Sequence, residues 1–194
     1  MRVICAYSTN LAGERAPYPE TREALEADGI EAEYVYVGGS PTAYHELLAR
    51  VWAEGQGFVN VEQDIVVRPG LIRELEACPE AYCGAPYAIS TTIGSWLGCV
   101  RFSDVLVTGW PSVFNAIDSL LPDGTPRKYW GRLDTRLKQV LESHLGLTMH
   151  LHWPAVEHLN PAQRPPIYTC SACGLALPWE VVREEPPWRC PRCG

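Results

Sequence analysis

The sequence lacks long hydrophobic runs and an excess of positive charge. No apolar stretch comes near the roughly 18 residues that a membrane-spanning helix requires, and the apolar start at residues 1–7 is too short for a signal peptide. The chain has 16 Lys and Arg against 23 Asp and Glu, which leaves a net charge of −7. This balance argues against a protein that coats DNA by charge alone. We expect a soluble protein of the cytoplasm, or of a host cytoplasm if the source is viral, with no membrane partner.

The sequence also lacks internal repeats, and its 46% hydrophobic and 20% charged residues are typical of a globular protein. The apolar pattern predicts strands that alternate with helices, which favours an α/β fold with helices on both faces of a sheet. Thr21, Thr42 and Ser103 are the expected helix N-caps. Strands are predicted at 2–6, 33–37, 57–67, 81–88, 96–102 and 150–153, and helices at 21–27, 43–52, 69–78, from 104, 111–121 and 133–146.

The eight cysteines form two sets with different surroundings. The first set is scattered among apolar residues and is predicted to pack as small buried side chains: Cys5, Cys78, Cys83 and Cys99. The second set forms two CxxC pairs near the end: Cys170, Cys173, Cys190 and Cys193. Four thiolates at this spacing suit a structural Zn²⁺ ion, which would supply the stability that so small a segment lacks. Disulfides or redox pairs are the alternative.

This tail resembles the zinc-ribbon family over residues 168–194. The proline-rich stretch at 161–167 is expected to link it to a first domain of residues 1–160. Zinc ribbons often bind nucleic acid or protein. Trp179 and Trp188 could stack on bases or pack the ribbon onto the first domain, and the sequence leaves this choice open.

An acidic tripeptide, Glu62-Gln63-Asp64, follows the apolar strand predicted from residue 57. Charged groups beside a buried strand need a partner, because burying an unpaired carboxylate is costly. Glu62 and Asp64 point to the same side of an extended chain, and their oxygens suit a divalent cation that also binds a diphosphate. The alternative is an acidic turn paired with arginines such as Arg68 or Arg73.

Four segments, taken in order, resemble the GT-A glycosyltransferases. Residues 58–69 look like the strand with the acidic DxD-type motif, here ExD, and residues 96–103 are similar to the strand and turn on the acceptor side. Residues 131–134 are like the place of the catalytic acid, and residues 156–160 resemble the late loop whose histidine completes the metal shell. The resemblance is to small phage or bacterial enzymes. It implies a GT-A-like, Rossmann-type mixed sheet and a nucleotide-sugar-binding catalytic domain over residues 1–160.

The resemblance further implies sugar transfer from a nucleotide-sugar donor to an acceptor hydroxyl, with Mn²⁺ or Mg²⁺ as cofactor. Asp64, Glu62 and His158 would hold this ion, and the two acids would also contact the donor. Asp134 would be the general base that deprotonates the acceptor, which implies a single displacement with inversion. The alternative is that both residues have only structural roles. His158 would then be a structural histidine, and Asp134 an acid favoured in the first helical turn by the macrodipole.

Other polar residues are placed near this site by the strand pattern. Tyr7, Ser8 and Thr9 end the first strand, where open α/β sheets bind ligands, and they would contact the nucleotide. His150 and His152 share one face of a strand. These two histidines either line the site or pack in the sheet.

Two other functions compete with this interpretation. A zinc-ribbon module that binds nucleic acid or protein would use the α/β domain only as a scaffold, although the acidic charge opposes this. A nucleotidyltransferase would carry a glycine-rich, basic phosphate loop after the first strand, and residues 7–22 hold only Gly13, Arg15 and Arg22. DNA with a modified base, or another polyhydroxy molecule, is the expected acceptor. The sequence leaves the oligomeric state open.

Overall fold

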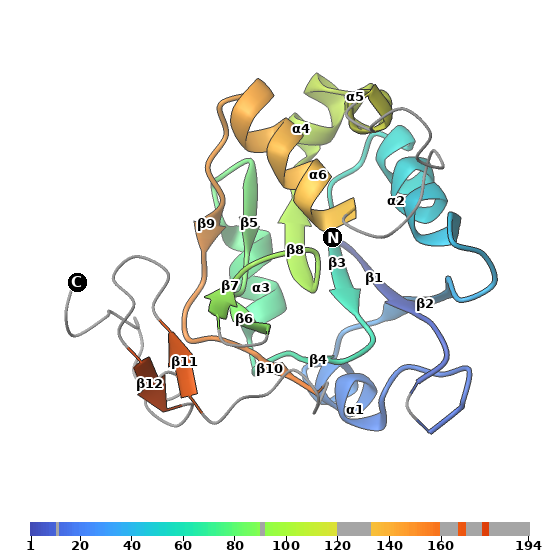
Figure 1. The fold of residues 1–194 in the computed structure, drawn as a ribbon, viewed down its shortest axis with the longest axis vertical. Coiled ribbons are helices and arrows are strands. Elements are labelled where there is room, and N and C mark those ends of the chain that lie inside the picture. Colours follow the sequence, from blue (N-terminus) through green and yellow to red (C-terminus); the bar gives the residue numbers. More distant parts are fainter. Residues whose placement is uncertain (11, 90–91, 120–132, 160–166, 170–175, 179–194) are drawn as a thin grey trace.

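The computed structural model describes residues 1–10, 12–89, 92–119, 133–159, 167–169 and 176–178 (Figure 1). Its main sheet has six strands in the order β2-β1-β3-β8-β5-β9. The strands are β1 (Arg2–Tyr7), β2 (Ala32–Tyr36), β3 (Phe58–Glu62), β5 (Tyr82–Gly84), β8 (Cys99–Phe102) and β9 (His150–Leu151). β1 runs parallel to β2 and β3, β8 runs antiparallel to its neighbours, and β9 runs parallel to β5.

Helices cover both faces of this sheet, so the predicted α/β fold with a mixed sheet is confirmed (Figure 1). One face packs against α1 (Pro19–Ala27) and α3 (Leu71–Ala77). The other face packs against α2 (Ala43–Ala53), α4 (Asp104–Gly109), α5 (Val113–Ser119), α6 (Leu133–Gln139) and the π-helical turn η1 (Val140–His144).

The strand alternation divides the core between these two faces. In β1, Ile4 and Ala6 pack toward α2, whereas Val3 and Cys5 pack toward α1 and α3. A sheet buried on both faces needs apolar residues at successive positions, and β1 has them. No helix in the described ranges is long and apolar enough to cross a membrane.

Several predicted boundaries are wrong. The strand predicted at 57–67 is interrupted at Gln63 and Asp64, and resumes as β4 (Ile65–Val66). The strand predicted at 81–88 divides into β5 and β6 (Tyr87–Ile89). β7 (Thr92–Gly94) was not predicted as a separate strand.

The structure confirms one of the three predicted N-caps. Ser103 is the expected N-cap of α4, and its Oγ accepts from the Leu106 N–H at 3.2 Å. Thr21 is not an N-cap, because α1 already begins at Pro19. Thr42 does stand before α2, but its side chain caps no backbone N–H.

The last described strands join two smaller sheets. β10 (Glu157–His158) pairs antiparallel with β4. β11 (Ile167–Thr169) pairs with β12 (Ala176–Pro178) and, at Thr169, with Thr92 of β7. The predicted zinc ligands and most of the predicted linker lie outside the described residues: Cys170, Cys173, Cys190, Cys193 and residues 161–166. The zinc ribbon therefore stays a prediction.

Candidate functional site

A cavity of about 780 Å³ lies at the carboxyl ends of β1 and β3. The chain leaves β1 through α1 on one face and reaches β3 through α2 on the other, so the strand order reverses between these two strands. Such a switch point opens a crevice at which α/β sheets bind ligands. The lining comes from residues 6–8, 37–41, 44, 62–64, 87, 97, 133–134 and 158.

Asp64 and His158 meet at this cavity although 94 positions separate them in the chain. The chain breaks its strand after Glu62, turns at Gln63 and Asp64, and resumes as β4. β4 then pairs with β10, which places His158 opposite Ile65. The Leu159 N–H also donates to the Asp64 backbone carbonyl at 2.7 Å. This pairing sets His158 Nε2 3.1 Å from Asp64 Oδ2.

The second ring nitrogen of His158 defines its tautomer. Nδ1 lies 3.0 Å from the Ala88 carbonyl oxygen, which can only accept, so Nδ1 carries a hydrogen. Burial lowers the pKa of His158, but the hydrogen bond and the charge of Asp64 outweigh burial and raise that pKa above 6.5. Nε2 therefore donates to Asp64 as an imidazolium, or offers its lone pair to a cation that both side chains bind.

Glu62 lines the same cavity but makes a different contact. Its Oε1 accepts from the Tyr44 hydroxyl at 2.9 Å. Burial and the negative charge of Asp64 raise the pKa of Glu62 to about 7, and the hydrogen bond from Tyr44 opposes this rise only in part. The carboxyl group thus exchanges a proton near neutral pH.

Glu62 does not complete a three-ligand cluster with Asp64 and His158. Within the described ranges, three such ligand atoms gather within 4.8 Å only at Cys78, His150 and His152. The assignment of Glu62 as a metal ligand stays a prediction.

Three polar residues that support the site were missed in the sequence. Asn60 is fully buried, and its Nδ2 donates to the Tyr44 hydroxyl at 2.8 Å and to the Leu97 carbonyl at 2.6 Å. Gln63 accepts from the Ser8 N–H at 2.7 Å, which ties the end of β3 to the end of β1. A polar residue within an apolar strand was a usable signal for Asn60. No such signal marked Tyr44 in the sequence, because Tyr44 fits the apolar stripe of α2.

The remaining predicted site residues lie around the cavity with one exception. Asp134, in the first turn of α6, and Tyr7 and Ser8, at the end of β1, are all in its lining. Thr9 lies just outside the lining, with its Oγ1 3.5 Å from the Tyr36 hydroxyl. The structure therefore does not place Thr9 against a ligand in the cavity.

The charge of the lining favours a bound cation. Three carboxylates, those of Glu62, Asp64 and Asp134, face the cavity, and its described lining contains no Lys or Arg. A diphosphate would meet three acidic side chains there and no Lys or Arg, so a divalent ion beside it would offset the repulsion between the negative charges. The 3.1 Å between Asp64 Oδ2 and His158 Nε2 matches the roughly 3 Å between neighbouring ligands of an octahedral ion. The donor set therefore fits Mn²⁺ or Mg²⁺.

No protein-family model matches the sequence, and no curated protein matches it. Several solved structures show distant similarity, among them the following three. A197 from STIV has 9% identity and a TM-score of 0.47, covering 78% of this chain and 82% of its own. A putative glucose-1-phosphate thymidylyltransferase from Bacillus anthracis has 11% identity and a TM-score of 0.45, with 78% and 85% covered. A glycosyltransferase involved in glycosylation of the major capsid of PBCV-1 has 13% identity and a TM-score of 0.42, with 82% and 94% covered. Similarity of this degree assigns neither a family nor an activity to this chain.

Proposed function

We propose that this chain is a metal-dependent glycosyltransferase that binds a nucleotide-sugar donor in the cavity. One observation carries the proposal: polar residues from four separate segments of the chain surround one cavity at the sheet's switch point. These residues are Tyr7, Ser8, Glu62, Asp64, Asp134 and His158.

Asp64 and His158 would hold the metal ion. A bound Mn²⁺ or Mg²⁺ neutralises negative charge that develops on the departing diphosphate. The Nδ1–H bond from His158 to the Ala88 carbonyl keeps Nε2 directed at Asp64. A hydrogen bond from the other ring nitrogen of this kind fixes the orientation of metal-binding imidazoles.

The ends of β1 and β2 would hold the nucleotide. Tyr7 and Ser8 line one wall, and residues 37–41 line the wall beside it. Gln63 accepts from the Ser8 N–H and donates to its Oγ at 3.2 Å, which holds this wall against the acidic tripeptide. Glu62, with its partner Tyr44, would accept a hydrogen bond from a donor hydroxyl.

Asp134 would act as the general base toward the acceptor. Its carboxylate lies at the N-terminal turn of α6, where the helix dipole stabilises negative charge. The side chain faces the same cavity as the metal-binding pair. A base at this position would take the proton of an acceptor hydroxyl as it attacks the sugar carbon, with inversion. The acceptor we propose is a hydroxyl of a modified nucleic-acid base or of another polyhydroxy molecule.

Removal of the Asp64 carboxylate tests the proposal. We expect Asp64→Asn to lower nucleoside diphosphate release from its nucleotide-sugar donor at least about 100-fold in the presence of Mn²⁺. Glu80→Gln, which changes an exposed acid outside the cavity, should keep wild-type activity. The donor is first found by thermal shift across a panel of nucleotide sugars with and without Mn²⁺.

Three outcomes would contradict the proposal. Full activity in Asp64→Asn is the first. Absence of any stabilisation by a nucleotide sugar with Mn²⁺ is the second, and it would favour the binding-module alternative. Release of pyrophosphate from a nucleoside triphosphate and a sugar 1-phosphate is the third, and it would identify a nucleotidyltransferase.

A further inference from the structure

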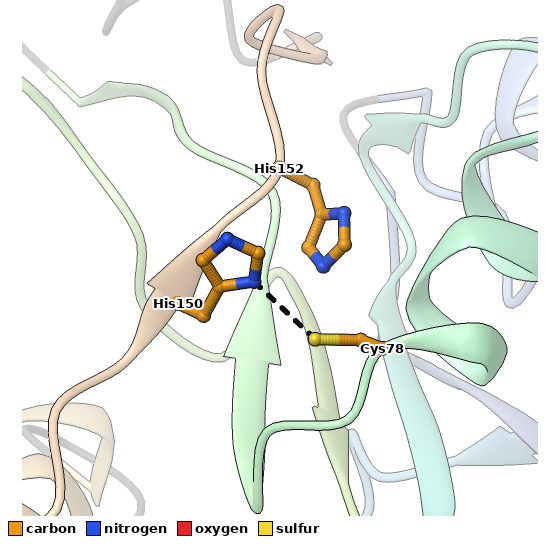
Figure 2. Close-up of side chains that lie close together, drawn as sticks. All are labelled: Cys78, His150 and His152. Atoms are coloured by element: carbon orange, nitrogen blue, oxygen red, sulfur yellow. Dashed lines mark hydrogen bonds between the residues drawn. The ribbon is translucent and has the colours of Figure 1, made fainter.

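A second group of metal-binding side chains lies at the edge of the main sheet, outside the cavity lining. Cys78 follows the last residue of α3, and His150 and His152 come from β9 and the residue after it. Figure 2 shows both imidazole rings turned toward the Cys78 sulfur. One ligand atom from each residue lies within 4.8 Å of the other two.

Strand pairing brings these three residues together. β9 runs parallel to β5, with His150 opposite Cys83 and Leu151 opposite Gly84. The His152 N–H continues the pairing by donating to the Gly84 carbonyl at 2.9 Å. Because side chains alternate along a strand, both histidines project to the side on which α3 ends. The prediction that they share a face is therefore correct. Neither histidine lines the cavity.

The distances suit a tetrahedral ion. Cys78 Sγ lies 3.3 Å from His150 Nδ1, close to the roughly 3.5 Å that a tetrahedral Zn²⁺ sets between a sulfur and a nitrogen ligand. Cys78 is buried, His152 is partly buried and His150 is exposed. The His150 ring also packs edge-on against the ring of His152, with the ring centroids 4.7 Å apart.

His152 supplies an independent observation. Its Nε2 is buried and has no hydrogen-bond partner among the described residues, and in Figure 2 this nitrogen faces Cys78. A buried polar atom without a partner costs free energy. Nδ1 of the same ring lies 3.9 Å from a Glu74 carboxylate oxygen. The negative charge of Glu74 favours the tautomer with its hydrogen on Nδ1, which leaves the Nε2 lone pair directed at the cluster.

We propose that Cys78, His150 and His152 bind a Zn²⁺ ion with one position open to solvent. A soft thiolate with two imidazoles selects zinc over Mg²⁺ or Mn²⁺, which prefer oxygen ligands. Binding would release the thiol proton of Cys78 to solvent. The ion would tie the end of α3 to β9, an edge strand that pairs with β5 over only two residues.

Zinc content of the full chain tests this site. Wild type, the double variant His150→Ala/His152→Ala and the control His144→Ala are equilibrated with micromolar free Zn²⁺ under reducing conditions, and zinc per chain is measured. His144 is an exposed histidine outside the cluster. We expect wild type and His144→Ala to hold one zinc more per chain than the double variant. Zinc bound by the tail cysteines is the same in all three and cancels. Equal zinc content would overturn the proposal.

Two further measurements separate loss of the ion from loss of the fold. His150 is exposed and contacts Cys78 and His152, so the melting temperature of His150→Ala with a chelator should stay close to that of wild type. Added Zn²⁺ should then raise the melting temperature of wild type more than that of His150→Ala. The second measurement is the absorption spectrum of the protein with Co²⁺ in place of Zn²⁺. Cys78→Ala should lose the sulfur-to-cobalt charge-transfer absorption that one thiolate contributes. An equal zinc response or an unchanged cobalt spectrum would overturn the proposal.

Discussion

At the scale of single residues, the Tyr44 hydroxyl organises the polar side of the cavity. It donates to Glu62 and accepts from Asn60. Burial, followed by the charge of Glu62, raises the pKa of Tyr44 well above 10, so the hydroxyl keeps its proton. Tyr44 can therefore act as a fixed donor to the carboxylate of Glu62.

Loss of this hydroxyl should destabilise the protein. We expect Tyr44→Phe to lower the free energy of unfolding by about 1 to 2 kcal/mol, because Glu62 loses its donor in a buried setting. Tyr34→Phe is the matched control, because the buried Tyr34 hydroxyl has no hydrogen-bond partner among the described residues. Urea unfolding at pH 7 measures both. Equal changes in the two variants would contradict the role given to Tyr44.

At the scale of elements, the turn between α2 and β3 fits tightly against the start of α4. A Cβ on Gly57 would lie 2.7 Å from the Asp104 backbone nitrogen and 2.8 Å from the Phe102 carbonyl oxygen. The Gly57 N–H also donates to the Asp104 carboxylate at 2.8 Å. Backbone on both sides leaves no flexible atom that could move aside, so glycine is required here by close approach.

Gly57→Ala should therefore cost stability. We expect a loss of about 1 to 3 kcal/mol, because the added methyl group would force β3 away from β8. At Gly109, the last residue of α4, a Cβ would have no neighbour within 4 Å. Gly109→Ala should be neutral or raise stability by up to about 1 kcal/mol through helix propensity. Chemical denaturation of the two variants compares them, and a neutral Gly57→Ala would show that the two elements are not tightly packed.

At the scale of the whole molecule, burial controls the chemistry of the core cysteines. Cys5, Cys83 and Cys99 are free and fully buried, as the sequence predicted. Burial above all raises the pKa of each thiol from 9.0 to about 12. These thiols should stay protonated at any physiological pH. Cys78 differs, because its sulfur contacts His150.

The raised thiol pKa values predict lower stability in alkali. The unfolded chain releases these protons near pH 9 while the folded chain holds them to about pH 12. The free energy of unfolding should therefore be unaffected below pH 9 and fall between pH 9 and 12, by up to about 1.4 kcal/mol per pH unit for each thiol. Urea unfolding at several pH values in reducing buffer measures the slope. Cys99→Ala should have a shallower slope than wild type, and an identical slope would show that Cys99 ionises equally in both states.

The order of the main-sheet strands and of the helices, the acidic tripeptide and most cavity-lining candidates could be predicted from the sequence by itself. Hydrophobic periodicity and strand-end polarity are local properties, so they are readable along the chain. The resemblance led us to expect Asp64 and His158 together, but the strand pairings that join distant residues were decided only by the tertiary structure. Pairing of β4 with β10 brings His158 to Asp64, and pairing of β9 with β5 brings His150 and His152 to Cys78. These pairings are two residues long and join segments far apart in the chain, so no turn between neighbouring strands fixes them and packing of the whole sheet decides which strands pair.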